Sequence, residues 1–293
     1  MTVLLGALEA GGTKMVCALG NENGDIFERE SFPTREPEPT MADIIAYFSG
    51  RGIEALGVSC FGPLDLNENS PTFGNITTTP KPGWQNVPIR AMLMDALNVP
   101  VGIDTDVNGA ALGEALLGAG RGCESLVYYT VGTGIGGGAY YHGMLLHGMV
   151  HPEMGHMIMR PHPEDPTPHG FCPFHDGCLE GMACGRAIEQ RWGVSARELP
   201  PEHIAWKIEA EYLAQMCVNT IVMHSPEKIV LGGGVMHQEQ LFPMVRARTQ
   251  EILGGYVAHP AVLRQIDRYI VPPALGNNSG AVGSLLLAVR ALG

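Results

Sequence analysis

The sequence is poor in positive charge. Of its 293 residues, 18 are Lys or Arg and 30 are Asp or Glu, so the formal net charge is −12. An acidic protein has no general attraction for nucleic acid or for anionic membranes, which argues against both as partners. No uninterrupted apolar run reaches the roughly 18 residues of a membrane span. Residues 1–9 lack the basic start of a signal peptide, so we expect a cytoplasmic protein.

Charged residues of either sign are also few, at 16% of the chain, against roughly 25% in average domains. A chain of this length with 45% hydrophobic residues can bury a substantial core, which argues against a disordered protein. Glycine, in contrast, is abundant, at 39 residues. The glycines gather in runs, and this indicates that the backbone comes close to a ligand.

The seven cysteines are odd in number, and a chain of this length needs no disulfide framework. A reducing compartment is therefore the default. Three of the cysteines lie within residues 172–184, with His175 between two of them. This crowding favours a metal site over disulfides.

Strand and helix patterns alternate along the chain. Two apolar runs around Glu-Ala-Gly-Gly-Thr-Lys predict a β-hairpin with its turn at residues 9–14. Further strands are expected at residues 55–59, 101–104, 126–131, 228–231 and 265–271. Helices are expected at residues 41–49, 89–97, 106–117, 184–192, 203–224, 238–253 and 279–292. This alternation is typical of α/β architecture with mixed sheets. We expect two domains, residues 1–117 and 118–293, with the last helix, about 279–292, packing back on the first domain.

Four glycine-rich loops stand at strand ends, at residues 9–14, 130–138, 231–235 and 275–281. None has the spacing of a P-loop or of a dinucleotide fingerprint. Each alone could be an ordinary turn. Together they predict a nucleotide site, in which two hairpin loops clamp a polyphosphate and a glycine-lined slot after residues 228–231 accepts a purine.

Asp106 follows a predicted strand and opens a predicted helix. It could cap the helix, or it could be a general base that takes a proton from an attacking hydroxyl. Glu114, two turns further on, could face a cleft or be a solvated helix residue.

The pattern Cys172-x-x-His175-x-x-Cys178 offers three metal ligands, and His156 is the natural fourth. Four protein ligands leave no open position, so the site would hold a structural zinc ion. The alternative is a set of free cysteines and surface histidines.

Taken together, these motifs resemble those of the ROK family (repressors, open reading frames, kinases). The resemblance covers the chain: Gly-Gly-Thr-Lys at 11–14, Thr-Gly-Ile-Gly-Gly-Gly at 133–138, Gly-Gly-Gly at 232–234, Glu-Met-Gly-His at 153–156 and the cysteine segment 172–180. It implies an actin-like, Hsp70-like ATPase fold of two α/β domains with an interdomain cleft. It also implies ATP-dependent phosphorylation of a hexose, and among members it is similar to bacterial fructokinases.

The resemblance implies a role for individual residues. Asp106 would be the catalytic base. ATP would be bound by Gly11, Gly12, Thr13, Lys14, Thr133, Gly134, Gly232, Gly233, Gly234 and Gly276. The sugar would be bound by Asn75, Thr105, Asp106, Glu153, His156 and Glu180. Zinc would be bound by His156, Cys172, His175 and Cys178. Mg²⁺ would accompany ATP, and the protein would be a homodimer.

Two positions depart from the family pattern. Glu9 stands where most members have Asp, and His175 stands where many have Cys. In the family's glucokinases an Asn precedes the catalytic Asp, whereas Thr105 stands here, and this favours fructose. Kinases for mannose, glucose or an N-acetylated hexosamine are the alternatives. A sugar-sensing regulator is a further alternative. Regulators of the family carry a helix-turn-helix before the sugar domain, whereas the first glycine turn of this sequence begins at residue 9, so we do not expect a regulator.

Overall fold

The computed structural model describes residues 3–293, which form two compact units. The first unit contains the chain up to Gly122 together with Gly138–Pro152 and Ala274–Gly293. The second contains Cys123–Gly137 and Glu153–Pro273. The chain forms two mixed five-stranded sheets with helices around them, which confirms the expected α/β architecture. Within residues 3–293, no helix is both long enough and apolar enough to cross a membrane.

The first unit is built on a sheet in the order β3–β2–β1–β4–β5. Its strands are β1 (Leu5–Ala10), β2 (Lys14–Gly20), β3 (Ile26–Pro33), β4 (Ala55–Cys60) and β5 (Val101–Thr105). The strands β1 and β2 pair antiparallel, so the expected hairpin is present. The strands β1, β4 and β5 run parallel to one another.

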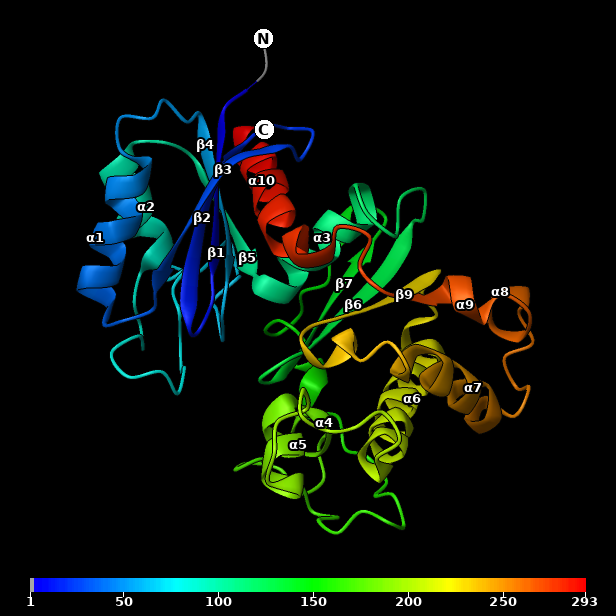
Figure 1. Cartoon of the computed structure of the whole chain (residues 1–293). Coiled ribbons are helices and arrows are strands. Elements are labelled where there is room, and N and C mark those ends of the chain that lie inside the picture. The colour runs from blue at the N-terminus through cyan, green and yellow to red at the C-terminus, as the bar shows by residue number, and fades with distance from the viewer. Residues whose placement is uncertain (1–2) are drawn as a thin grey trace. The chain divides into compact units, whose positions relative to one another are not determined.

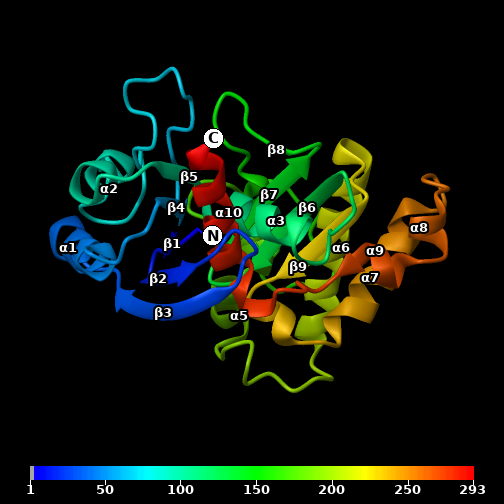
Figure 2. The ribbon, with the colours of Figure 1, turned by 90° about the horizontal axis from the view of Figure 1, so that it is seen from above.

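Helices cover both faces of this sheet (Figures 1 and 2). On one face lie α1 (Pro37–Phe48) and α2 (Ile89–Leu97), and on the other lie α3 (Asp106–Leu116) and α10 (Ser279–Leu292). The helix α10 packs against β1, β4, β5 and α3. The last helix of the chain therefore completes the unit that the first residues begin.

The close approach of α10 depends on small residues. A Cβ atom at Gly57 of β4 would lie 1.7 Å from the Ser284 carbonyl oxygen. Where α10 crosses α3, a Cβ atom at Gly283 would lie 1.8 Å from the Gly109 carbonyl oxygen. Such distances exclude any side chain at these two glycines unless the backbone moves.

The second sheet has the order β10–β9–β6–β7–β8. Its strands are β6 (Ser125–Val131), β7 (Ile135–Tyr141), β8 (Met144–Leu145), β9 (Lys228–Gly232) and β10 (Ile270–Val271). The strand β9 runs parallel to both β6 and β10. The helices of the second unit are α4 (Leu179–Ala183), α5 (Gly185–Trp192), α6 (Ile204–His224), α7 (Leu241–Leu253), α8 (Pro260–Leu263) and α9 (Ile266–Tyr269).

One predicted strand is largely wrong. The strand expected at residues 265–271 is a short helix, α9, followed by only two strand residues. Its apolar residues Ile266, Tyr269 and Ile270 have the i, i+3, i+4 spacing of a helix, which explains the outcome. The edge strand β3 went unpredicted because most of its residues are exposed and its sequence lacks an apolar alternation.

Candidate functional site

The first glycine-rich turn joins β1 to β2, and its carbonyls are held by protein donors. Thr34 donates twice, from Oγ1 to the Gly11 carbonyl at 2.7 Å and from its N–H to the Thr13 carbonyl at 3.0 Å. Lys81 Nζ donates to the Gly12 carbonyl at 2.5 Å. The N–H groups of Gly12 and Thr13 have no protein acceptor within residues 3–293. The turn thus offers amide hydrogens, as a phosphate site requires.

Asp106 is the first residue of α3, directly after β5. Thr105 is the N-cap, because its Oγ1 accepts a hydrogen bond from the Asn108 N–H at 3.1 Å. The capping role that the sequence left open for Asp106 is therefore filled by Thr105, which is 3% exposed. Asp106 is half-buried, and its Oδ1 accepts from the Val107 N–H at 2.9 Å.

The buried Asp104 fixes this junction. Its Oδ1 accepts from the Thr105 N–H at 2.7 Å and from Asn108 Nδ2 at 2.8 Å. Its Oδ2 lies 2.8 Å from His147 Nε2. This hydrogen bond raises the pKa of His147 above its usual value. The turn that carries Asp106 is thereby tied to the segment after β8.

Glu114, near the other end of α3, is fully buried. Its carboxylate accepts from the N–H groups of Ala119, Ala274 and Leu275 and from Ser279 Oγ, at 2.7 to 3.0 Å. A solvated position for Glu114 is thus excluded. The carboxylate shapes the fourth glycine-rich loop, where Gly276 has a φ of +57°.

The second glycine-rich turn, in the second unit, joins β6 to β7 and contacts Glu180. The Ile135 N–H donates to Glu180 Oε2 at 2.9 Å. A Cβ atom at Gly134 would lie 2.5 Å from the same oxygen, so a side chain there would displace the Glu180 carboxylate. The other carboxylate oxygen lies 4.0 Å from His156 Nε2. Glu180 therefore links the turn with Thr133 and Gly134 to His156.

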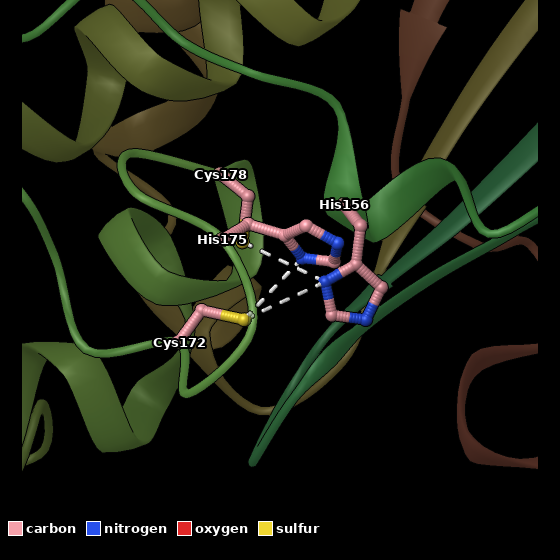
Figure 3. A group of neighbouring side chains, drawn as sticks. All are labelled: His156, Cys172, His175 and Cys178. Atoms are coloured by element: carbon pink, nitrogen blue, oxygen red, sulfur yellow. Dashed lines mark hydrogen bonds between the residues drawn. The ribbon is translucent and has the colours of Figure 1, made fainter.

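Four side chains of the second unit converge on one point (Figure 3). The ligand atoms of His156, Cys172, His175 and Cys178 all lie within 4.8 Å of one another. Cys172 Sγ is 3.5 Å from His175 Nδ1, and Cys178 Sγ is 3.6 Å from His156 Nδ1. Zinc bonded tetrahedrally to sulfur and nitrogen would hold these atoms about 3.5 Å apart. The structure thus brings together the four residues predicted as a metal site.

Two further residues predicted to contact the sugar, Glu153 and Asn75, lie in different units. Glu153 is exposed and stands before the 3₁₀ helix η1 (Met154–His156), and its carbonyl accepts from the His156 N–H at 3.0 Å. Asn75 is half-buried in the first unit, where its carbonyl accepts from the Asp65 N–H at 3.0 Å.

The third glycine run ends β9 and leads into the 3₁₀ helix η2 (Val235–His237). Gly232 is the last residue of β9. Gly233 has a φ of +93°, and a Cβ atom there would lie 2.4 Å from the Val131 carbonyl oxygen. A Cβ atom at Gly234 would meet nothing within 4 Å. Gly233 is therefore required by the turn itself, whereas Gly234 borders open space.

Three long-range contacts of this site were not predicted from the sequence. Lys81, His147 and the clamping role of Glu114 all depend on partners distant in the chain. Lys81 lies 69 residues from Gly12, and His147 lies 43 residues from Asp104. No local pattern signals such contacts.

The fold and these groups define an α/β protein with four glycine-rich turns, a carboxylate at a helix start and a Cys₂His₂ cluster. The ROK family model matches residues 5–291. The chain belongs to the ROK family.

Relatives match over nearly the whole length. A fructokinase of Pediococcus pentosaceus is 45% identical, and the match covers 99% of each chain. A fructokinase of Streptococcus mutans is 42% identical over 99% of each chain. The crystal structure of the ROK hexokinase from Thermus thermophilus is 30% identical and superposes with a TM-score of 0.80, covering 100% of this chain and 99% of that one. This likeness confirms the expected actin-like ATPase fold.

Proposed function

We propose that the protein is an ATP-dependent kinase that converts D-fructose to fructose 6-phosphate. One observation carries the proposal: the first unit holds both a turn that presents amide hydrogens and an aspartate at the start of a helix. Phosphoryl transfer needs these two groups, a phosphate cradle and a base that orients the hydroxyl. The fructokinase relatives support fructose as the acceptor.

In the proposed reaction Asp106 is the general base. Its carboxylate takes the proton of the sugar O6 hydroxyl as O6 forms a bond to the γ-phosphorus of ATP. The bond from that phosphorus to the β,γ-bridging oxygen breaks, and its electron pair leaves with ADP. Asp106 then releases the proton to solvent. Asp104 and Thr105 hold the backbone around Asp106, so little reorganisation is needed during the reaction.

We assign the ATP contacts by unit. In the first unit, Gly11, Gly12, Thr13 and Lys14 would contact phosphates, and Gly276 would lie near the adenosine. In the second unit, Thr133 and Gly134 would contact phosphates. Gly232, Gly233 and Gly234 would approach the purine, a role supported by the open space at Gly234.

We assign the sugar contacts to Asn75, Thr105, Asp106, Glu153, His156 and Glu180. Carboxylates and amides suit sugars because each oxygen can accept from a hydroxyl and fix its direction. Glu180 Oε2 is already engaged by the Ile135 N–H, so the sugar would meet Oε1. Thr105 is buried, and its oxygen accepts from Asn108. It offers no amide to a glucose hydroxyl, which supports fructose.

The Cys₂His₂ cluster fits a structural zinc ion in donor type and in spacing. His156 and His175 would bind through Nδ1, and Cys172 and Cys178 through sulfur. Zinc supplies no chemistry in this role, since four protein ligands leave no open position. Bound through Nδ1, His156 would direct Nε2 toward Glu180, the side on which we place the sugar.

Mg²⁺ neutralises charge on the β- and γ-phosphates when bound. Burial raises the pKa of Glu9, although Lys14 and Arg29 oppose the shift. We propose that Mg²⁺ would enter with ATP.

We further propose a homodimer that works in the cytoplasm, where its cysteines form no disulfides. Light scattering in solution tests the dimer.

The function is tested by ADP release with fructose, glucose, mannose and N-acetylmannosamine at fixed ATP and Mg²⁺. We expect kcat/KM to be highest for fructose. A higher value for another sugar would reassign the substrate, and sugar-independent ADP release would refute the kinase.

A further inference from the structure

Lysine is scarce in this chain, yet two lysines lie at the first glycine-rich turn. The four lysines are Lys14, Lys81, Lys207 and Lys228. Lys14 begins β2 directly after the turn. Lys81 comes from a distant loop, and its Nζ lies 2.5 Å from the Gly12 carbonyl oxygen.

The ammonium group of Lys81 is only partly used by this contact. It carries three donors and no acceptor, and the Gly12 carbonyl takes one of them. No carboxylate within residues 3–293 forms an ion pair with it. The charge therefore stands unneutralised at the first glycine-rich turn, whose Gly12 and Thr13 N–H groups also have no protein acceptor in the described chain. The Thr13 N–H shares a trans peptide with the Gly12 carbonyl and points to the other side of the turn. Donors left without a partner in this way favour an anion.

The loop that carries Lys81 is held firmly. Trp84 is fully buried, and its Nε1 donates to the Arg35 carbonyl at 2.8 Å. Gln85 Nε2 donates to the Thr79 carbonyl at 3.1 Å. The Trp84 N–H in turn donates to the carbonyl of Lys81 at 3.2 Å. The lysine thus extends from a fixed base, which lowers the entropy lost when it binds a ligand.

Resting on the proposed function, we propose that Lys81 is a further catalytic residue, whose ammonium contacts the phosphoryl group during its transfer from ATP to the sugar oxygen. Lys81 keeps its proton throughout, while Asp106 accepts the proton of the hydroxyl and ADP leaves with the electron pair of the broken bond. The positive charge stabilises the oxygens of the moving group.

The test separates charge from simple support of the turn. Lys81→Gln keeps an N–H donor for the Gly12 carbonyl but removes the charge, and Lys81→Arg restores the charge. We expect Lys81→Gln to lower kcat by about 10²-fold or more, the range for losing one preorganised transition-state contact. The affinity for MgADP, which lacks the transferred group, should change less than about twofold. Lys81→Arg should recover at least about tenfold in kcat.

The matched control is Lys207→Gln, which removes an exposed lysine paired with Glu164 in the second unit. It should leave kcat unchanged. Near wild-type kcat in Lys81→Gln would overturn the proposal. A joint loss of MgADP affinity and thermal stability in Lys81→Gln would also overturn it, because this would show that Lys81 only supports the structure of the turn. If wild-type protein releases no ADP with any sugar, the proposed function fails instead, and the two failures are distinct.

Discussion

Glu114 on α3 accepts a hydrogen bond from Ser279 Oγ at 2.7 Å, although 165 residues separate them in the chain. The same carboxylate accepts from the N–H groups of Ala274 and Leu275. One helix thus carries the proposed base at its start and holds the loop of Gly276 near its end.

We predict that Glu114→Gln disturbs this loop and weakens ATP binding. An amide has one acceptor oxygen and a donor group that would face N–H donors. The loss of buried partners costs about 1–3 kcal/mol. KM for ATP should rise about tenfold, with less change for fructose, as initial rates will show. Glu251→Gln, at an exposed glutamate of α7, is the control. Equal losses for both substrates would contradict the assignment.

Asp106→Asn should preserve the fold, because Thr105 and not Asp106 caps the helix. It should lower kcat by about 10²-fold or more, the range for a positioned base. Steady-state rates at saturating fructose and ATP measure this effect, and Asp95→Asn on α2 serves as control. Wild-type turnover in Asp106→Asn would remove Asp106 from the mechanism.

Zinc should be present at about one ion per chain, by elemental analysis of protein purified without chelator. Cys178→Ser should release it and speed hydrogen exchange in residues 157–178. KM for fructose should then rise more than KM for ATP. Cys123→Ser, outside the cluster, should keep the metal. The site would be refuted if wild-type protein contains no zinc and has the same KM for fructose as Cys178→Ser.

The pair of His147 and Asp104 predicts a pH dependence of stability. Its hydrogen bond raises the pKa of His147 in the folded protein. The pair therefore stabilises the fold fully below the unfolded-state pKa of about 6.5, and this contribution disappears as the pH rises through the raised value. In urea unfolding, the stability difference between wild type and His147→Gln should be larger at about pH 6 than at about pH 9. His237→Gln is the control, and a pH-independent difference would contradict the prediction.

Gly234→Val should raise KM for ATP with little effect on the melting temperature, because the position borders open space. Gly233→Val should destabilise the protein, because its backbone has a positive φ and Val131 leaves no room. A melting scan beside the ATP titration separates the two effects. Unchanged KM for ATP in Gly234→Val would argue against a purine near this turn.

Local patterns were enough for much of the fold and for the Cys₂His₂ cluster. The hairpin at residues 9–14 and the helix Ser279–Leu292 follow from apolar spacing over a few residues. The predicted ligands Cys172, His175 and Cys178 lie within one short segment. Their convergence with His156 could be predicted because ligand spacing is a strong chemical signal.

Contacts between distant segments could not be predicted in this way. The sequence around Glu114 is compatible with a solvated helix face, and only the return of the chain at Ala274 buries it. The same holds for Lys81, whose position beside Gly12 depends on a loop built around Trp84. Register and burial across such distances are set by the whole fold.

The helix α10 also bears on synthesis of the protein at the ribosome. It packs on β1, β4 and β5, yet it is made after every other helix and strand of residues 3–293. After Gly122 emerges, the ribosome must still translate the chain up to Ala274 before α10 begins. At about 5–20 residues per second this takes roughly 8–30 s. During that time only α3 covers that face of the oldest sheet, and the nascent chain exposes apolar surface to chaperones and to aggregation.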